Sequence, residues 1–132
     1  MSDRVAKPSD LELQVLSVLW ERGPQTVRDI LALLPDGKDR AYTTVLTILQ
    51  GMSRKGFVTH TQDGPAHVYH PAVTRADVLH PMMRTLVQHA FGGDPSRVVQ
   101  ALLGSGDVST DDLKEIRKLI NRAVRDGQED RS

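Results

Sequence analysis

The chain has 132 residues, no cysteine, and 17 basic residues balanced by 17 acidic ones. This length fits one domain with at most a small second unit, and the lack of cysteine excludes disulfides, thiolate zinc sites and cysteine nucleophiles. No apolar run approaches the ~18 residues of a membrane span, and the first residues hold no apolar signal segment. We therefore expect a cytoplasmic protein that does not associate with membranes.

Basic residues are unevenly distributed along the chain although the net charge is zero. Residues 3–36 hold four basic and six acidic residues, whereas residues 38–60 hold four basic residues and one acidic residue. The second segment therefore carries a local charge of +3 (4 − 1). Such a segment can face phosphates or be ordinary solvated surface, and charge alone favours ordinary surface.

Two short helices are predicted in the first 35 residues. Residues 9–12, Ser-Asp-Leu-Glu, form a capping box, and apolar residues then recur at helical spacing as far as Gly23. A similar box at residues 26–29 begins a second helix, and Pro35 ends it.

A third helix and a hairpin follow. The third helix is predicted over residues 41–55 and closed by Gly56. Residues 57–61 and 67–70 read as two strands joined by a turn at residues 63–65. Two short helices, a third helix and a β-hairpin, in this order, are typical of a winged helix-turn-helix domain.

The rest of the chain is predicted to be helical. One helix runs from a box at Thr74 to about Ala90, and we expect Pro81 to kink or split it. Two glycines break this helix before Asp94-Pro95, which begins another. A last helix begins at the box formed by residues 109–112 and gives way to a polar tail.

The predicted fold class is mainly α with a small β-hairpin. We expect a winged-helix DNA-binding domain in residues 1–73, a helical dimerisation domain in residues 74–126 and a polar tail in residues 127–132. The last helices are too few to enclose a core, which favours packing against a second copy over folding back on the first domain. The side chains expected at this dimer interface are Val98, Val99, Leu102, Leu103, Leu113, Ile116, Leu119 and Ile120.

Short polar side chains at the start of the third helix suit the reading of DNA bases. Thr43, Thr44 and Thr47 lie within about one turn, and each offers a hydroxyl for base edges or phosphates and a methyl for thymine. Three threonines alone are more often cap or surface residues, but the helix pair before them and the hairpin after them favour a reading helix. The residues predicted to contact DNA are Arg40, Tyr42, Thr43, Thr44, Thr47, Gln50, Arg54, Lys55 and His67.

Two residues of this helix keep more than one interpretation. Tyr42 could stack on a sugar or bind a phosphate, and it could equally pack on the first helix. Gly51 costs about 1 kcal/mol relative to alanine inside a helix. It either permits close approach of another backbone or is simply tolerated.

The five histidines do not predict a metal site, and no motif predicts an enzyme. His67 and His70 differ by an odd number along one strand, so their side chains point to opposite faces. No glycine-rich phosphate loop, HExxH or GxSxG motif occurs. We therefore expect no catalytic residues, no metal and no cofactor.

Several segments in order resemble one family. They are LELQVLSVLWERGPQTVRDILALLP at 11–35, AYTTVLTILQGMSRKGFVTH at 41–60 and AHVYHPAV at 66–73, with FGG at 91–93 and LLGSGDVSTDDLKEIRKLI at 102–120. On these segments the chain resembles the penicillinase-repressor family of bacterial winged-helix regulators, of the BlaI, MecI and CopY type.

The resemblance implies a homodimer that binds inverted repeats in promoters and represses transcription, often of genes for β-lactam resistance or copper handling. It implies that residues 41–55 form the recognition helix, residues 57–71 the wing and residues 75–125 an interlocked dimerisation domain. Many relatives carry a basic residue where Gly51 stands, so one phosphate contact of the family is absent here.

The resemblance does not extend to the family's induction routes. In β-lactam members a sensor-protease system cuts an Asn-Phe bond, and Gln100-Ala101 stands at the matching position, which argues against a sensor protease as a partner. Copper-responsive members use a cysteine-rich tail, and this chain has no cysteine.

The leading hypothesis is a dimeric, sequence-specific DNA-binding regulator that represses from a palindromic operator in double-stranded DNA. One alternative is a winged-helix protein-interaction module, which the neutral net charge favours. Another is a regulator that responds to a ligand or a metal.

Overall fold

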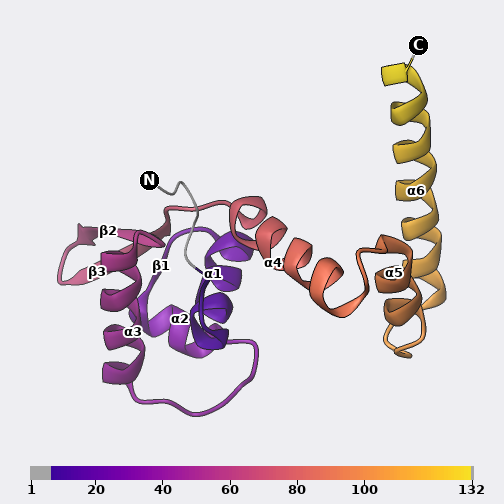
Figure 1. Ribbon diagram of the computed structural model, residues 1–132. Helices are drawn as coiled ribbons and strands as arrows, with labels where there is room; N and C mark the ends of the chain where they lie inside the picture. The colour runs from indigo at the N-terminus through magenta and orange to yellow at the C-terminus, as the bar shows by residue number, and fades with distance from the viewer. Residues whose placement is uncertain (1–6, 132) are drawn as a thin grey trace. The chain divides into compact units, whose positions relative to one another are not determined.

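The computed structural model describes residues 7–131, which form two compact units divided between Arg84 and Thr85 (Figure 1). Residues 1–6 of the expected DNA-binding domain and Ser132 of the expected tail lie outside the described residues. The first unit contains α1 (Asp10–Arg22), β1 (Gln25–Thr26), α2 (Val27–Leu33), α3 (Tyr42–Lys55), β2 (Val58–Asp63) and β3 (Ala66–Pro71). The helix α4 (Arg75–Ala90) spans the division, and the second unit contains α5 (Pro95–Leu103) and α6 (Thr110–Arg131).

The predicted caps begin the first two helices. At α1 the Ser9 side chain accepts from the Glu12 amide, and the Glu12 carboxylate accepts from the Ser9 amide at 2.8 Å, which makes the capping box reciprocal. At α2 the Thr26 hydroxyl accepts from the Asp29 amide at 3.2 Å. Each bond satisfies an amide that would have no partner inside the helix.

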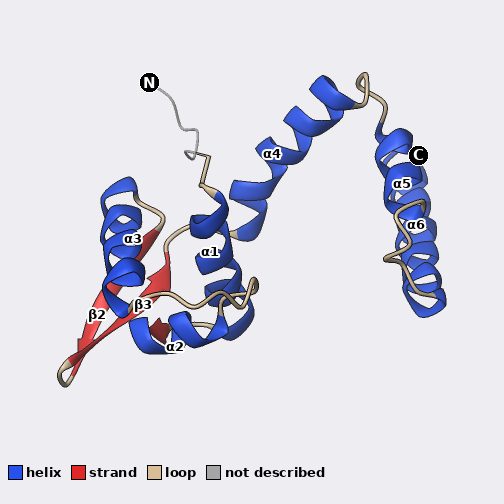
Figure 2. Ribbon diagram, turned by 90° about the horizontal axis from the view of Figure 1, so that it is seen from below, coloured by secondary structure: helices blue, strands red, loops and turns tan. Residues whose placement is uncertain are grey.

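The sheet has three strands rather than the predicted two. β2 and β3 form the expected antiparallel hairpin, with His60 opposite Tyr69, and β1 adds to the other edge of β3 (Figure 2). In that pairing Gln25 lies opposite Tyr69 and Thr26 opposite Val68. A strand of two residues is too short for any alternating pattern, so the sequence carries no signal for it.

The buried apolar core lies entirely in the first unit. It brings together the inner faces of the three helices, the start of β2, the middle of β3 and the first turn of α4. The buried apolar residues are Val15, Leu16, Val18, Leu19, Val27, Ile30, Leu34, Val45, Leu49, Met52, Phe57, Val58, Tyr69 and Val78. This core holds α3 against α1 and α2 and thereby fixes which face of α3 meets solvent.

The helix α4 passes through Pro81 without dividing. Of the two outcomes expected for Pro81, a split helix is therefore wrong, and a kink stays a prediction. Proline removes one helical hydrogen bond, but Pro81 is exposed, so water can satisfy the carbonyl that loses its partner.

The second unit contains the predicted break after α4, followed by two capped helices. Gly92 and Gly93 adopt positive φ angles of 61° and 79°, and Asp94 then caps α5 by accepting from the Ser96 amide. At the start of α6, Ser109 accepts from the Asp112 amide, and the Ser109 amide donates to the Asp112 carboxylate. The helix continues to Arg131, so the backbone expected to form a polar tail is helical.

Candidate nucleic-acid interface

One face of α3 is polar and exposed. Thr43, Thr47, Gln50 and Arg54 recur at intervals of four, three and four residues, which places them on one stripe of the helix. All four are exposed, whereas the opposite face is buried in the core through Val45, Leu49 and Met52. The buried face therefore anchors the helix in the core, and the exposed face presents hydrogen-bonding side chains to solvent.

The three threonines lie near the start of this exposed face. Thr44 is exposed and makes no side-chain hydrogen bond among the described residues. The Thr47 hydroxyl donates to the Thr43 carbonyl at 2.9 Å. The methyl group of Thr47 and the acceptor positions of its hydroxyl oxygen therefore remain for another molecule.

Tyr42, the first residue of α3, lies at the surface. Its side chain is 45% exposed, and the Arg28 guanidinium of α2 lies 6.0 Å from the centre of its ring. This arrangement places Tyr42 beside α2, with nearly half of its side chain open to another molecule.

Arg40 is engaged in the connection between α2 and α3. Its guanidinium donates two hydrogen bonds to the Asp36 carboxylate, at 2.9 and 2.7 Å. These bonds, with those from the Lys38 amide and from Gln14, hold the pKa of Asp36 well below its usual range. Arg40 therefore orders the approach to α3, and a DNA contact from it competes with this pair.

Lys55, at the other end of α3, is paired within the chain as well. Its ammonium donates to the Glu12 carboxylate at 2.7 Å, where Lys55 is half exposed and Glu12 is buried. Burial opposes ionisation of Glu12, but the bonds from Lys55 and Ser9 together hold its pKa below the ordinary value. The pair ties α3 to the start of α1 and limits the freedom of Lys55 to reach a phosphate.

Exposed histidines lie along the hairpin. The rings of His60 and His67 stack with their centres 4.8 Å apart, and His60 also lies 5.4 Å from Tyr69. His70 is bonded instead to the Thr61 hydroxyl at 2.9 Å. The described residues contain no group of three or more His, Asp or Glu side chains suited to a metal ion.

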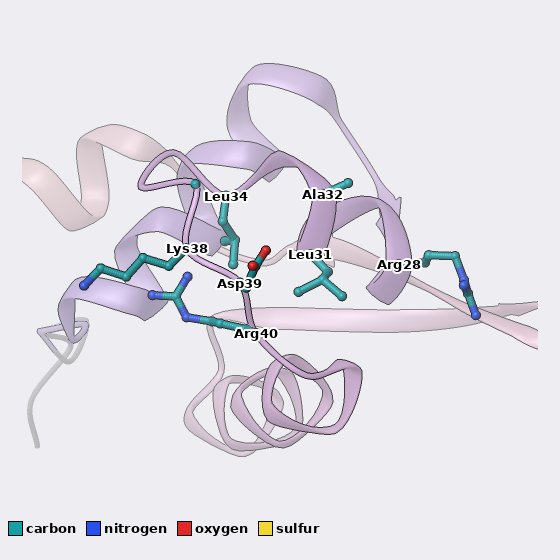
Figure 3. Close-up of a pocket in the computed structure, with 8 residues that line it drawn as sticks. Arg28, Leu31, Ala32, Leu34, Lys38, Asp39 and Arg40 are labelled. Atoms are coloured by element: carbon teal, nitrogen blue, oxygen red, sulfur yellow. The ribbon is translucent and has the colours of Figure 1, made fainter.

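The connection between α2 and α3 borders a hollow of about 400 Å³ that is lined in part by Leu31, Leu34 and Asp39 (Figure 3). In this view Lys38 and Arg40 extend to one side, while Arg28 points away in the opposite direction. Arg28 also lines a second hollow, on the side of Tyr42 and His67. Arg28 was not among the residues predicted to contact DNA, because its closeness to α3 becomes apparent only in the folded chain.

The residues expected at a dimer interface lie on apolar faces that the single chain leaves uncovered. No side chain of α5 is buried, and none of the described side chains of α6 is buried. Val98 and Ile116 are half-buried, and the other six expected residues are exposed. The described helices include none long and apolar enough to cross a membrane.

Comparison with known proteins identifies relatives over nearly the whole chain. A family model described as penicillinase repressor matches residues 8–122. The transcriptional regulator BlaI of Mycobacterium tuberculosis H37Rv is 38% identical over 81 residues, which are 61% of this chain and 59% of that protein. The methicillin resistance regulatory protein MecI of Staphylococcus aureus N315 is 20% identical over 122 residues, 92% of this chain and 99% of its own length.

A solved structure has the same fold as the first unit. The solution structure of the DNA-binding domain of the repressor BlaI superposes with a TM-score of 0.50 and 25% identity, covering 58% of this chain and 93% of that domain. The first unit is thus a winged-helix domain, in which the β2–β3 hairpin that follows α3 is the wing. Since the family model also spans α4, α5 and most of α6, the chain belongs to the penicillinase repressor family.

Proposed function

We propose that the chain is a dimeric, sequence-specific DNA-binding repressor of transcription. The observation that carries this proposal is the exposed polar stripe of α3, which is held by a buried core and flanked by a wing. An α-helix with this profile fits the major groove, where each base pair presents a distinct pattern of donors and acceptors. The relatives bear the names of a transcriptional regulator and a resistance regulator, which supports the same function.

The side chains have different roles in this proposal. Thr43, Thr44 and Thr47 read base edges, and Gln50 extends the same stripe. Contacts to the phosphate backbone position the domain on the duplex without reading sequence, and Arg54 and His67 are suited to them. Arg40 and Lys55 are paired with Asp36 and Glu12, so a phosphate contact from either of them requires it to give up that partner.

A second copy of the chain completes the proposed regulator. In the domain organisation that we propose, residues 1–73 bind DNA, residues 74–126 dimerise and residues 127–132 serve neither role. Two winged helices related by a two-fold axis read an inverted repeat whose half-sites are one helical turn, or a multiple of one turn, apart. A chromosomal operator places this action in the cytoplasm, and repression by occupancy requires no catalytic step and no cofactor.

The direct test measures binding of the full chain to the DNA upstream of its own gene by fluorescence anisotropy. We expect a dissociation constant on the order of 10⁻⁸ M or tighter at physiological salt, weakening steeply as salt rises. A scrambled duplex of the same composition is the control. Equal affinity for both duplexes at every salt concentration would contradict sequence-specific binding, and no binding to either would leave a protein-interaction module as the better hypothesis.

Replacement of Thr44 by alanine tests the reading face. We expect Thr44→Ala to lose about 1–3 kcal/mol of discrimination between the operator and the scrambled duplex, while binding to the scrambled duplex is kept. Thr85→Ala, at an exposed helical position of α4, is the matched control and should change neither affinity. If Thr44→Ala weakened binding to both duplexes equally, Thr44 would be a backbone contact instead.

A further inference from the structure

A second hollow lies beside α3, where three elements of the first unit meet. Its volume is about 360 Å³, and it is open to solvent. Thr26 and Arg28 line it from the start of α2, Tyr42 from the start of α3, and residues 65–67 from the turn and first strand positions of the wing. The hollow therefore adjoins the N-terminal end of the proposed recognition helix, on its wing side.

The lining is positively charged and contains no acidic residue. Arg28 and His67 contribute nitrogen donors, and the other lining side chains are neutral. Among the described residues, Arg28 forms no ion pair, unlike Arg40 and Lys55, and it is exposed. A planar cation without a partner, at the rim of an open hollow, suits a bidentate bond to a phosphate.

The neighbouring side chains hold and extend this donor set. The Tyr42 ring lies beneath the Arg28 guanidinium, with 6.0 Å between the guanidinium carbon and the ring centre. The Thr26 hydroxyl oxygen accepts from the Asp29 amide, so its proton remains available to donate. His67 stacks on His60, which supports its ring from the other strand of the wing.

The adjacent hollow shown in Figure 3 is a poorer anion site. There the Asp39 carboxylate is part of the lining, and Arg40 is already paired with Asp36. Arg28 lines that hollow as well, but in the same view its guanidinium extends away from Lys38 and Arg40. The wing-side hollow is therefore the one in which no carboxylate of the lining competes with an anion for Arg28.

We propose that Arg28, Tyr42 and His67 bind one backbone phosphate of duplex DNA, with the Arg28 guanidinium as the principal donor. This inference rests on the proposed function, because it places the phosphate on the strand that borders the groove read by α3. The proposal assigns a DNA contact to α2. It also means that side chains from α2, α3 and the wing contact the same phosphate. A contact of this kind fixes the angle at which α3 enters the groove without reading sequence.

The first test replaces Arg28 by glutamine, which keeps most of the side-chain length and removes the charge. We expect Arg28→Gln to weaken binding to operator and scrambled duplexes alike, by about tenfold for each half-site, and to reduce the salt slope by about 1 for each half-site. The matched control is Arg22→Gln, an exposed arginine at the end of α1 that forms no ion pair in the described part of the chain. Both variants should unfold at the same temperature as the wild type, because neither side chain is buried.

The second test asks whether one phosphate is the target. A series of operator duplexes carries a single uncharged methylphosphonate at successive backbone positions on each strand. We expect one position per half-site at which the methylphosphonate weakens binding by the wild type but causes no further loss of affinity in Arg28→Gln. Tyr42→Phe and His67→Gln should show reduced sensitivity at the same position, because the three side chains share one partner.

The outcomes separate this inference from the proposed function. If the wild type binds the operator specifically while Arg28→Gln keeps the same affinity and salt slope, the phosphate site is refuted and the proposed DNA-binding function stands. If Arg28→Gln binds DNA more weakly but stays as sensitive as the wild type to every methylphosphonate, Arg28 acts through general electrostatics and the site is likewise refuted. If the wild type binds no DNA at all, the proposed function itself fails.

Discussion

At the scale of single residues, Glu12 makes two interactions, a helix cap and an ion pair, and the sequence predicts only the cap. Its place in the Ser9–Glu12 capping box follows from local spacing, and the structure confirms the box. Its ion pair with Lys55 joins residues far apart along the chain, on α1 and α3. No local pattern indicates that contact, since it depends on how the core packs the two helices together.

Replacement of Lys55 by methionine tests the ion pair. We expect Lys55→Met to lower the free energy of unfolding by about 1–2 kcal/mol at pH 7, because a buried carboxylate loses a charged partner while Lys55 itself is half exposed. The folded-state pKa of Glu12 lies below its ordinary value of 4.5. The contribution of the pair is therefore present above about pH 4.5 and is lost as the pH falls through the folded-state pKa.

Urea unfolding at pH 7 and at pH 3 provides the measurement. The difference between Lys55→Met and the wild type should be largest at pH 7 and should shrink as the pH falls through the folded-state pKa of Glu12, because a protonated Glu12 no longer needs a cation. Lys38→Met, at an exposed lysine of the α2–α3 connection, should cost little at either pH. A Lys55→Met effect that is independent of pH would mean that the lost side-chain packing, not the charge, is responsible.

Arg28 shows why single residues of the site escape sequence reasoning. The threonines of α3 are adjacent in sequence and could be predicted together, whereas Arg28 lies in a segment with more acidic than basic residues. Its significance arises only when α2, α3 and the wing surround one hollow. Lys55 and Arg40 are the converse case, because both belong to the positive segment and yet both are paired with carboxylates.

At the scale of elements, helix boundaries follow closely from the caps. Ser9, Thr26, Asp94 and Ser109 each accept a backbone amide at the start of a predicted helix. The elements that were missed or misjudged depend on the surroundings instead. The strand β1 forms only because β3 offers a free edge, and α4 continues through Pro81 on an exposed face.

Within α3, Gly51 is half-buried and has no visible reason to be glycine. A Cβ atom added there would meet only the Arg54 guanidinium, at 3.7 Å, which is an ordinary contact. No other part of the described chain approaches it within 4 Å. The described part of the chain therefore offers no backbone that approaches Gly51 closely, and close approach of a backbone from another molecule stays a prediction.

Gly51→Ala is expected to stabilise the protein by about 0.5–1 kcal/mol, because alanine has the higher helix propensity and fits without strain. Urea unfolding measures the change, and operator affinity should stay within about twofold of the wild type. Gly56→Ala is the contrasting control, since Gly56 ends α3 with a φ of 86°. It should destabilise by about 1–2 kcal/mol although its surroundings are open. A stable Gly51→Ala variant with much weaker binding would show that the DNA requires the glycine.

At the scale of the whole molecule, the first unit can fold around its own core, and the described side chains of the second unit form none. In the part of the chain that the structure describes, the fourteen buried apolar residues all fall between Val15 and Val78. In α5 and α6, by contrast, Leu102, Leu119 and Ile120 are each more than half exposed. Apolar faces of this extent on capped helices indicate a missing partner, and the sequence could predict this because the apolar residues recur at helical spacing.

We expect Leu119→Gln to weaken the dimer at least tenfold, because it places an amide in the apolar face of α6 that we propose pairs with a second copy. Lys118→Gln is the matched control, since residue 118 lies on the opposite face of α6 and is exposed. Sedimentation velocity over a range of concentrations measures the change, and DNA binding provides a second readout.

Loss of the dimer should weaken binding to a full operator and leave binding to a single half-site unchanged, because each winged helix keeps its own core. An equal loss on both duplexes would mean that α6 supports the winged helix itself, and an unchanged dimer would remove α6 from the interface.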